Sequence, residues 1–324
     1  MKKSFILLLF LGVSAAFAQQ KVEYRVIESH AKLPYVQVGL IATGLDVSVP
    51  FQNIDAFQLN AGLGLDAKMH IGNLLHVQAY GYRANFIDMQ RWFGLDEGIL
   101  GAENKNEADP GRGFEFDLGA SFTPFIKKTN GKGATRVPLK TVSDRRVGSR
   151  RWTETTTYID IPGEHVTFKG FRGGINRYRY NLAGNLLTAS GESFRDHYGS
   201  ITATALYGGV SWSSYSYAKI NAVGYGEKKG GMLFSLYADV FFGPTAAMTM
   251  ISNQQEYEIV SADGVAIGNN PLGFRLGFER YTAGRFGIGY RLEGGVRPGF
   301  AKSPYLRMDL IMPVYSMGKP SKKD

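Results

Sequence analysis

The chain has no cysteine, which excludes disulfide bonds, thiolate chemistry and the cysteine-anchored lipid of a lipoprotein. It also lacks a long apolar run beyond its amino terminus, so we expect no membrane-spanning helix. Histidine is scarce, with 5 residues in the chain, and we expect neither a metal site nor another cofactor. The absence of cysteine agrees with export from the cell.

The first residues read as a secretory signal peptide. Two lysines follow the initiating methionine, a short apolar run comes next, and alanines stand at the two positions that signal peptidase reads. We therefore predict a signal peptide over residues 1–18. Residues 19–33 are expected to form a periplasmic segment ahead of the main domain.

Apolar residues then recur at every second position in segment after segment. Near the end of the chain, Ile288, Tyr290 and Leu292 fall on one face of a strand, and Arg291 and Glu293 fall on the other. The longest stripe covers residues 57–71. A strand that is apolar on one side and charged on the other is typical of the wall of a transmembrane β-barrel.

Nine such strands can be placed, four before and five after a basic insertion at 127–173. Bacterial single-chain barrels have an even number of strands, so this region must add an odd number of crossings. One crossing over 175–190 gives ten strands, whereas two more, over 134–142 and 152–161, give twelve. We prefer twelve, because ten would leave a long periplasmic insertion where short turns are usual.

The predicted fold is thus an all-β, antiparallel, up-and-down transmembrane barrel of 12 strands (alternatively 10) over 34–316, followed by a basic periplasmic tail at 317–324. In the 175–190 crossing, Tyr178 and Leu186 are expected to face outward and Arg177 inward. Short connections at 72–73, 226–229 and 283–284 are expected in the periplasm. The long connections 90–112 and 243–270 are expected outside, with 143–151 joining them if there are twelve strands.

This combination of export signal, alternating strands, short inner turns and long outer loops resembles a Gram-negative outer-membrane β-barrel. The resemblance covers about 34–316 and is one of architecture, with no motif of a particular family. It implies an outer-membrane location in contact with membrane lipid and lipopolysaccharide.

Charged residues of the closing strands are predicted to form a ladder inside the barrel. A three-residue turn at 283–285 would set Arg275 opposite Glu293, and the next hairpin would set Glu293 opposite Arg307 and Arg291 opposite Asp309. Glu279 lies on the same face. The ladder either pairs its own charges and fills a narrow barrel or lines a constriction that selects charged solutes.

The formal charge of +9 belongs to one region, because thirteen Lys and Arg stand against four carboxylates between Lys127 and Ser190. Its densest part contains Arg145, Arg146, Arg150 and Arg151, whose guanidinium groups can pair with phosphate or carboxylate. If this stretch faces outward, it suits lipopolysaccharide or an acidic glycan. If it is periplasmic, a protein partner or peptidoglycan fits better, and nucleic acid is not expected.

Histidine-based catalysis finds little support. His70 and His76 point inward at the periplasmic rim, whereas barrel hydrolases work at the outer rim. Asp196 and His197, with Ser193 or Ser200, supply triad residue types on an outer loop, but a triad is defined by geometry. We therefore predict a non-catalytic barrel that acts as an envelope interaction or assembly component. The alternative is a small-solute channel with a charged lumen.

Overall fold

The computed structural model describes residues 22–30, 33–34, 36–48, 58–72, 74–87, 113–145, 152–252, 255–262, 264–267, 270–282, 288–299 and 304–317. The predicted signal peptide, the 88–112 connection and the end of the basic tail lie outside them. In this part of the chain no helix is long and apolar enough to span a membrane. The strands are β1 (Tyr24–His30), β2 (Val36–Ser48), β3 (Gln58–Ile71), β4 (Leu75–Ile87), β5 (Gly113–Arg145), β6 (Trp152–Thr188), β7 (Ser193–Ala222), β8 (Gly226–Ser252), β9 (Gln255–Ala262), β10 (Val265–Ala266), β11 (Leu272–Thr282), β12 (Gly289–Val296) and β13 (Pro304–Met317).

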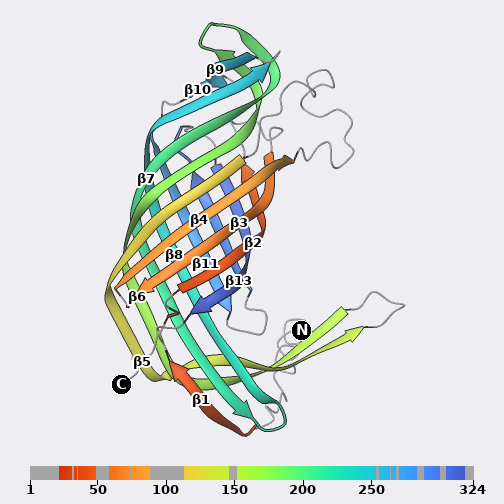
Figure 1. The fold of residues 1–324 in the computed structure, drawn as a ribbon, viewed down its shortest axis with the longest axis vertical. Helices are drawn as coiled ribbons and strands as arrows, with labels where there is room; N and C mark the ends of the chain where they lie inside the picture. The colour runs from red at the N-terminus through yellow and green to blue at the C-terminus, as the bar shows by residue number, and fades with distance from the viewer. Residues whose placement is uncertain are drawn as a thin grey trace, which may run out of the picture.

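Ten of these strands close into an antiparallel barrel (Figure 1). The ring runs from β2 through β8 in chain order, continues with β11, β12 and β13, and closes where β13 pairs with β2. The preference for twelve strands was therefore wrong, and the ten-strand alternative is confirmed. Segments 134–142 and 152–161 are indeed strands, but they prolong β5 and β6 beyond the rim instead of adding crossings.

The pairing registers show how strongly the strands tilt. A path that starts at Leu75 in β4 and steps from each residue to its pairing partner on the next strand returns to β4 after one turn of the ring. It returns at Ile87, which is 12 residues farther along the strand. With about 3.3 Å per residue and about 4.8 Å between strands, this stagger tilts ten strands by about 40°, as in membrane barrels. A barrel of this size is narrow enough for side chains to fill.

The two ends of the barrel differ. At one end β2 begins and β13 finishes, and Val36 pairs there with Met317. We call this end the terminus end, and we call the opposite end the far end. The β3–β4 and β7–β8 turns lie at the terminus end, as predicted for short turns. Arg145 at the end of β5 pairs with Trp152 at the start of β6 at the terminus end, whereas the twelve-strand arrangement required residues 143–151 on the side of the long connections.

At the terminus end, β5 and β6 leave the wall as a two-stranded ribbon, which we define as residues 133–145 paired with 152–163. It projects sideways from the barrel (Figure 1). Val137, Leu139 and Ile161 of the ribbon pack on Ala218 and Ile220 of β7 in a small separate core. The ribbon covers these two β7 residues. Beside β7, β1 adds a further strand.

At the far end, β6, β7, β8 and β9 form a second, smaller closed ring, because β9 pairs with both β8 and the end of β6. Its interior holds a compact apolar cluster that includes Leu186, Ile201, Met248 and Ile259. The β6–β7 connection is a tight turn made by residues 189–192, with Gly191 at a φ of 89°, a conformation that favours glycine. The described part of the far end is therefore a folded cap with its own core.

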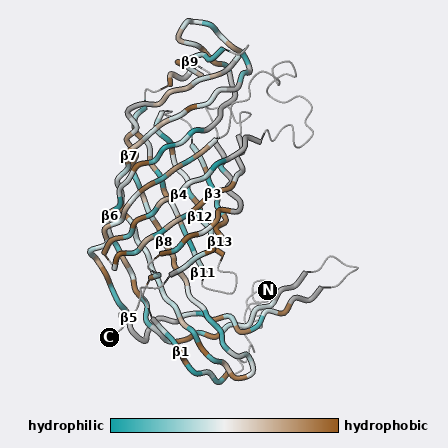
Figure 2. Tube along the Cα trace, in the orientation of Figure 1, coloured by the Kyte–Doolittle hydropathy of each residue, from teal (hydrophilic) through white to brown (hydrophobic). Residues whose placement is uncertain are grey.

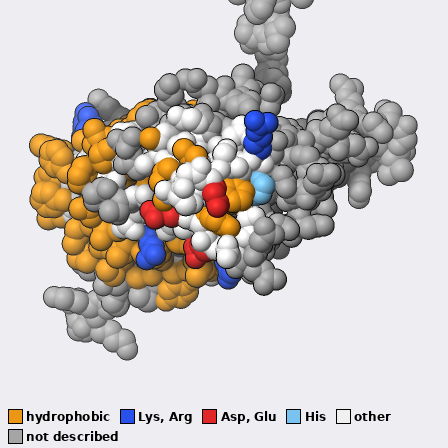
Figure 3. Space-filling model, turned by 90° about the horizontal axis from the view of Figure 1, so that it is seen from above, with side chains coloured by type: hydrophobic (Ala, Val, Ile, Leu, Met, Phe, Trp, Pro, Cys, Tyr) orange, Lys and Arg blue, Asp and Glu red, His pale blue; other side chains and the backbone are white. Residues whose placement is uncertain are grey.

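Apolar and polar residues alternate along the barrel strands (Figure 2), and apolar side chains cover the visible flank in the end-on view of Figure 3. Leu63, Leu276 and Leu306 expose 67%, 60% and 52% of their surface on the outside. The predicted faces are thus confirmed for most strands. They are reversed in the 175–190 crossing, where Tyr178 is 2% exposed and faces inward while Arg177 is exposed on the outside.

Candidate functional site

The barrel interior is filled by charged side chains, each with less than a tenth of its surface exposed. The described basic residues of this luminal network are fewer than the acidic ones, and Tyr or Asn side chains donate hydrogen bonds to several of the carboxylates. The network consists of Asp46, Asp66, Lys68, Glu115, Asp117, Arg172, Asp239, Arg275, Glu279, Arg291, Glu293, Arg297, Arg307 and Asp309.

Arg275 on β11 ties three other strands together in the middle of the network. Its guanidinium lies 2.9 Å from Asp117 on β5, 2.8 Å from Asp239 on β8 and 3.6 Å from Glu293 on β12. Because β5 lies four places from β11 around the ring of ten strands, the contact with Asp117 spans the lumen. Arg172 on β6 also contacts Asp239, at 3.1 Å.

A second set of contacts spans the barrel nearer the far end. Arg307 on β13 lies 2.8 Å from Glu115 on β5 and 2.7 Å from Asp309. Arg297, which follows β12, contacts Asp46 at 2.5 Å and Glu115 at 3.3 Å. Glu115 therefore receives guanidinium groups from β13 and from the residue that follows β12, both on the opposite wall.

A third set lies nearer the terminus end. Arg291 on β12 reaches Asp66 on β3 at 2.5 Å, and Lys68 on β3 forms an ion pair with Glu279 on β11. The hydroxyl of Tyr281 donates to Asp66 at 2.6 Å. Buried charges are tolerated only when they are paired and hydrogen-bonded, and these three sets supply partners at successive levels of the lumen.

Aromatic rings separate the charged groups and stack on the guanidinium planes. The Arg307 guanidinium lies 4.0 Å from the centre of the Tyr80 ring, that of Arg297 lies 3.9 Å from Tyr305, and that of Arg172 lies 3.9 Å from Tyr237. Such contacts gain strength when they are desolvated. Rings and ion pairs together occupy the section of the barrel that a solute would have to cross.

The connection after β12 reaches across the far end of the lumen. The Tyr178 hydroxyl donates to the carbonyl of Pro298 at 2.5 Å, which fixes this connection to β6 on the opposite wall. Gly299 follows with φ of 97°, a conformation that favours glycine. A Cβ on Gly273 would lie 2.7 Å from Pro298, so the connection packs tightly against the wall.

The structure brings all six residues of the predicted ladder into the lumen. Two registers are confirmed, since Glu293 pairs with Arg307 and Arg291 with Asp309. The third was wrong: Gly277 stands opposite Glu293, because β11 and β12 are joined through residues 283–288, a longer connection than a three-residue turn. Arg275 still reaches Glu293 diagonally. Whether the ladder selects solutes stays a prediction.

Eight of the fourteen members of the network were not in the predicted ladder, and two of them, Arg172 and Asp46, show why. Arg172 was counted with the basic insertion, although it lies in the wall on β6 and is 8% exposed. Its alternation with Phe171, which is 59% exposed, was the signal that could have revealed it. Asp46 was hidden by a register shift in β2 between Ile41 and Gly44.

The four arginines proposed for partner binding are only partly within the described residues. Arg145 ends β5 and pairs with Trp152 at the ribbon tip. Arg146, Arg150 and Arg151 lie outside the described residues.

The histidines whose side chains are described make hydrogen-bond contacts. His70 and His76 face each other beside the β3–β4 turn, with their Nδ1 atoms 2.7 Å apart, at the terminus-end rim as predicted. His197 Nδ1 lies 2.7 Å from the carbonyl oxygen of Arg195, and Ser200 accepts a hydrogen bond from Arg179. The side chain of Asp196 lies outside the described residues. Within those residues no cluster of three or more metal-ligating side chains occurs.

No protein-family model matches the chain, and no curated protein matches it. Among solved structures it is similar to OmpT, an outer membrane protein of Vibrio cholerae, with 8% identity over 89% of this chain and 99% of that chain and a TM-score of 0.19. A loop L8 deletion mutant of OmpT gives 8% identity, coverages of 87% and 100%, and a TM-score of 0.16. The architecture assigned to the chain rests on its own strand pairing.

Proposed function

We propose that the chain is an integral outer-membrane β-barrel without catalytic activity, which serves the cell envelope as an interaction or assembly component. The observation that carries this proposal is the set of ion pairs joining opposite walls, above all Arg275–Asp117 and Arg307–Glu115. A solute path through the lumen would require these buried pairs to separate. The ends of the barrel are then the surfaces left for binding.

The outer wall supports a position in the membrane. Apolar side chains predominate on its exposed face, and β2, with 13 residues, rises about 33 Å at a tilt of about 40°. That height exceeds the roughly 25 Å of an outer-membrane apolar band. Because both ends of a bacterial barrel chain face the periplasm, the terminus end and its ribbon belong on that side.

The ribbon is the part best suited to a partner. A two-stranded hairpin is marginally stable alone in water, and the described contacts of the ribbon with β7 come from its inner half. The outer half exposes Lys140, Thr141, Val142 and Tyr158 and leads to the arginine-rich tip. An acidic surface of a periplasmic protein, or the carboxylates of peptidoglycan, would complement this charge. At the far end, lipopolysaccharide is the expected neighbour.

Single-protein conductance in a planar bilayer tests the closed lumen. We expect no steady current from protein whose folding is verified by its heat-shifted gel mobility, with empty detergent as the control. Steady current steps whose ion selectivity changes in Arg291→Gln and Arg307→Gln would instead establish the small-solute channel.

Site-directed crosslinking tests the ribbon, since the chain has no native cysteine. A Thr141→Cys variant should give a crosslinked product in intact envelopes, and neutralising Arg145 and Arg150 should abolish it. Lys229→Gln, a charge change at the same end of the barrel but off the ribbon, is the matched control. A product that survives neutralisation of the tip, or that is lost equally in the control, would contradict charge-based binding.

A further inference from the structure

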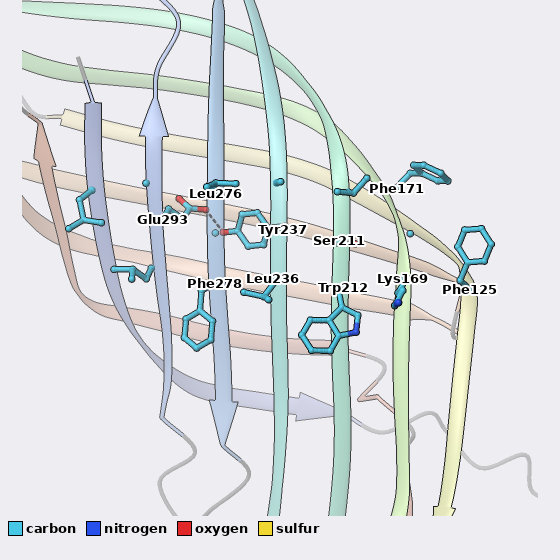
Figure 4. Close-up of a pocket in the computed structure, with 17 residues that line it drawn as sticks. Phe125, Lys169, Phe171, Ser211, Trp212, Leu236, Tyr237, Leu276, Phe278 and Glu293 are labelled. Carbon is cyan, nitrogen blue, oxygen red and sulfur yellow. Dashed lines mark hydrogen bonds between the residues drawn. The ribbon is translucent and has the colours of Figure 1, made fainter. Parts of the chain in front are cut away.

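An open groove runs diagonally across the outer wall from β5 to β13, with a volume of about 1120 Å³ (Figure 4). Two neighbouring rows of outward side chains border it, each following paired positions from strand to strand. The lower row is Lys169, Trp212, Leu236, Phe278 and Leu292, and the upper row is Phe171, Val210, Ala238, Leu276, Gly294 and Leu306. Tyr237 and Glu293 turn to the luminal side, where they hydrogen-bond to each other.

The upper row is hollow because it contains two small residues among large ones. Ala238 and Gly294 flank Leu276, and a Cβ on Gly294 would have its nearest neighbour at 3.4 Å. Leu236, Leu276 and Phe171 expose 40%, 60% and 59% of their surface around this hollow. The surface is therefore a furrow with apolar walls.

The groove has one polar end. Lys169 on β6 is exposed and stands beside Trp212, its partner on β7, and Figure 4 shows the indole nitrogen on the side of the ring toward the lysine. Within the described residues, neither the Lys169 ammonium nor the Trp212 N–H has a polar partner. Two hydrogen-bond donors are thus left at the entrance to an apolar furrow.

A row of aromatic rings lies at the same level of the barrel wall as this polar end of the groove. The rings of Trp212, Phe234, Phe278 and Tyr290 follow one another around the wall, with centroids 5.4, 5.1 and 5.5 Å apart. Aromatic girdles of this kind lie at the membrane–water boundary. The line occupies the terminus-end side of the wall, which the proposed function places at the inner leaflet.

We propose that the groove is a binding site for one glycerophospholipid of the inner leaflet. The phosphate accepts hydrogen bonds from the Lys169 ammonium and the Trp212 N–H, and an acyl chain lies in the furrow over Ala238 toward Gly294. Between Lys169 and Leu306 the groove crosses five strand spacings, which is about 24 Å. The length of the groove therefore exceeds the roughly 15 Å depth of one leaflet. This assignment rests on the proposed membrane position of the barrel.

Native mass spectrometry of barrels released from vesicles of phosphatidylglycerol and phosphatidylethanolamine tests the site. We expect one retained lipid per barrel, about tenfold less retention in Lys169→Gln, and a similar loss in Trp212→Phe, which keeps the ring and removes the donor. Ala238→Leu should reduce retention by filling the furrow without changing charge. Lys128→Gln, an equal charge change outside the groove, should retain lipid as the wild type does, and excess inorganic phosphate should not compete.

The outcomes separate the two proposals. Retention that is the same in Lys169→Gln, Trp212→Phe and wild type, or that falls equally in Lys128→Gln, would overturn the site while leaving the membrane barrel intact. Protein that shows no heat-shifted mobility and does not enter the vesicles would overturn the membrane position and the lipid site together.

Discussion

Replacing Arg275 by leucine should destabilise the barrel more than any surface charge change. The substitution removes the cation that faces Asp117, Asp239 and Glu293, which are all buried. Breaking a buried ion pair by removing one partner costs about 3–5 kcal/mol. Tyr207, Arg172 and Tyr237 remain as partners of the three carboxylates, so we expect the lower limit, about 3 kcal/mol.

The measurement is a urea titration of the folded barrel in lipid vesicles, followed by the fluorescence of its 3 tryptophans. The matched control is Arg136→Leu, which breaks an ion pair with Asp160 whose members are 68% and 43% exposed and should cost at most about 1 kcal/mol. Adding Asp117→Asn to Arg275→Leu should recover part of the loss, because one uncompensated charge disappears. If Arg275→Leu unfolded with the same midpoint as Arg136→Leu, the luminal pairs would not hold the walls together.

Three further outcomes are expected. Leu63→Arg places a charge on the outer wall and should prevent accumulation in the outer-membrane fraction, because a mid-bilayer charge costs about 2–4 kcal/mol; normal accumulation would show that this stripe does not face lipid. Gly64→Ala should lower the unfolding midpoint, since its Cβ would lie 2.2 Å from a backbone oxygen of β4, whereas Gly208→Ala, which has open space, should not. A membrane-impermeant maleimide should label Ser190→Cys in intact cells and Thr141→Cys only after permeabilisation; the reverse pattern would invert the proposed orientation.

Much of the barrel could be predicted from the sequence, because a strand with one face on the outside of a barrel and one on a packed lumen must alternate residue by residue. The 57–71 stripe and the pairing of Arg291 with Asp309 followed from this alternation. The strand number did not, since the alternation of 134–142 and 152–161 is equally compatible with a membrane crossing and with a ribbon that packs on β7. Which applies depends on the long-range contact with Ala218 and Ile220.

The reversed faces of 175–190 have a different cause. Tyrosine suits either face of a barrel wall, because its ring is apolar and its hydroxyl needs a partner only when buried. Tyr178 finds that partner in the Pro298 carbonyl, more than a hundred positions away in the chain, and no local pattern reveals it. The bulge in β2 that hides Asp46 is likewise set by pairing with β3.

The continuity of β5 and β6 from wall to ribbon has a mechanical consequence. No loop or hinge separates the two parts, although register shifts near Thr129 and Pro138 bend the pair. A force along the strands loads many ladder hydrogen bonds together, whereas a sideways force on the tip opens them one after another. A partner that pulls along the ribbon is therefore resisted by the whole barrel wall, and one that pulls across it is released by unzipping.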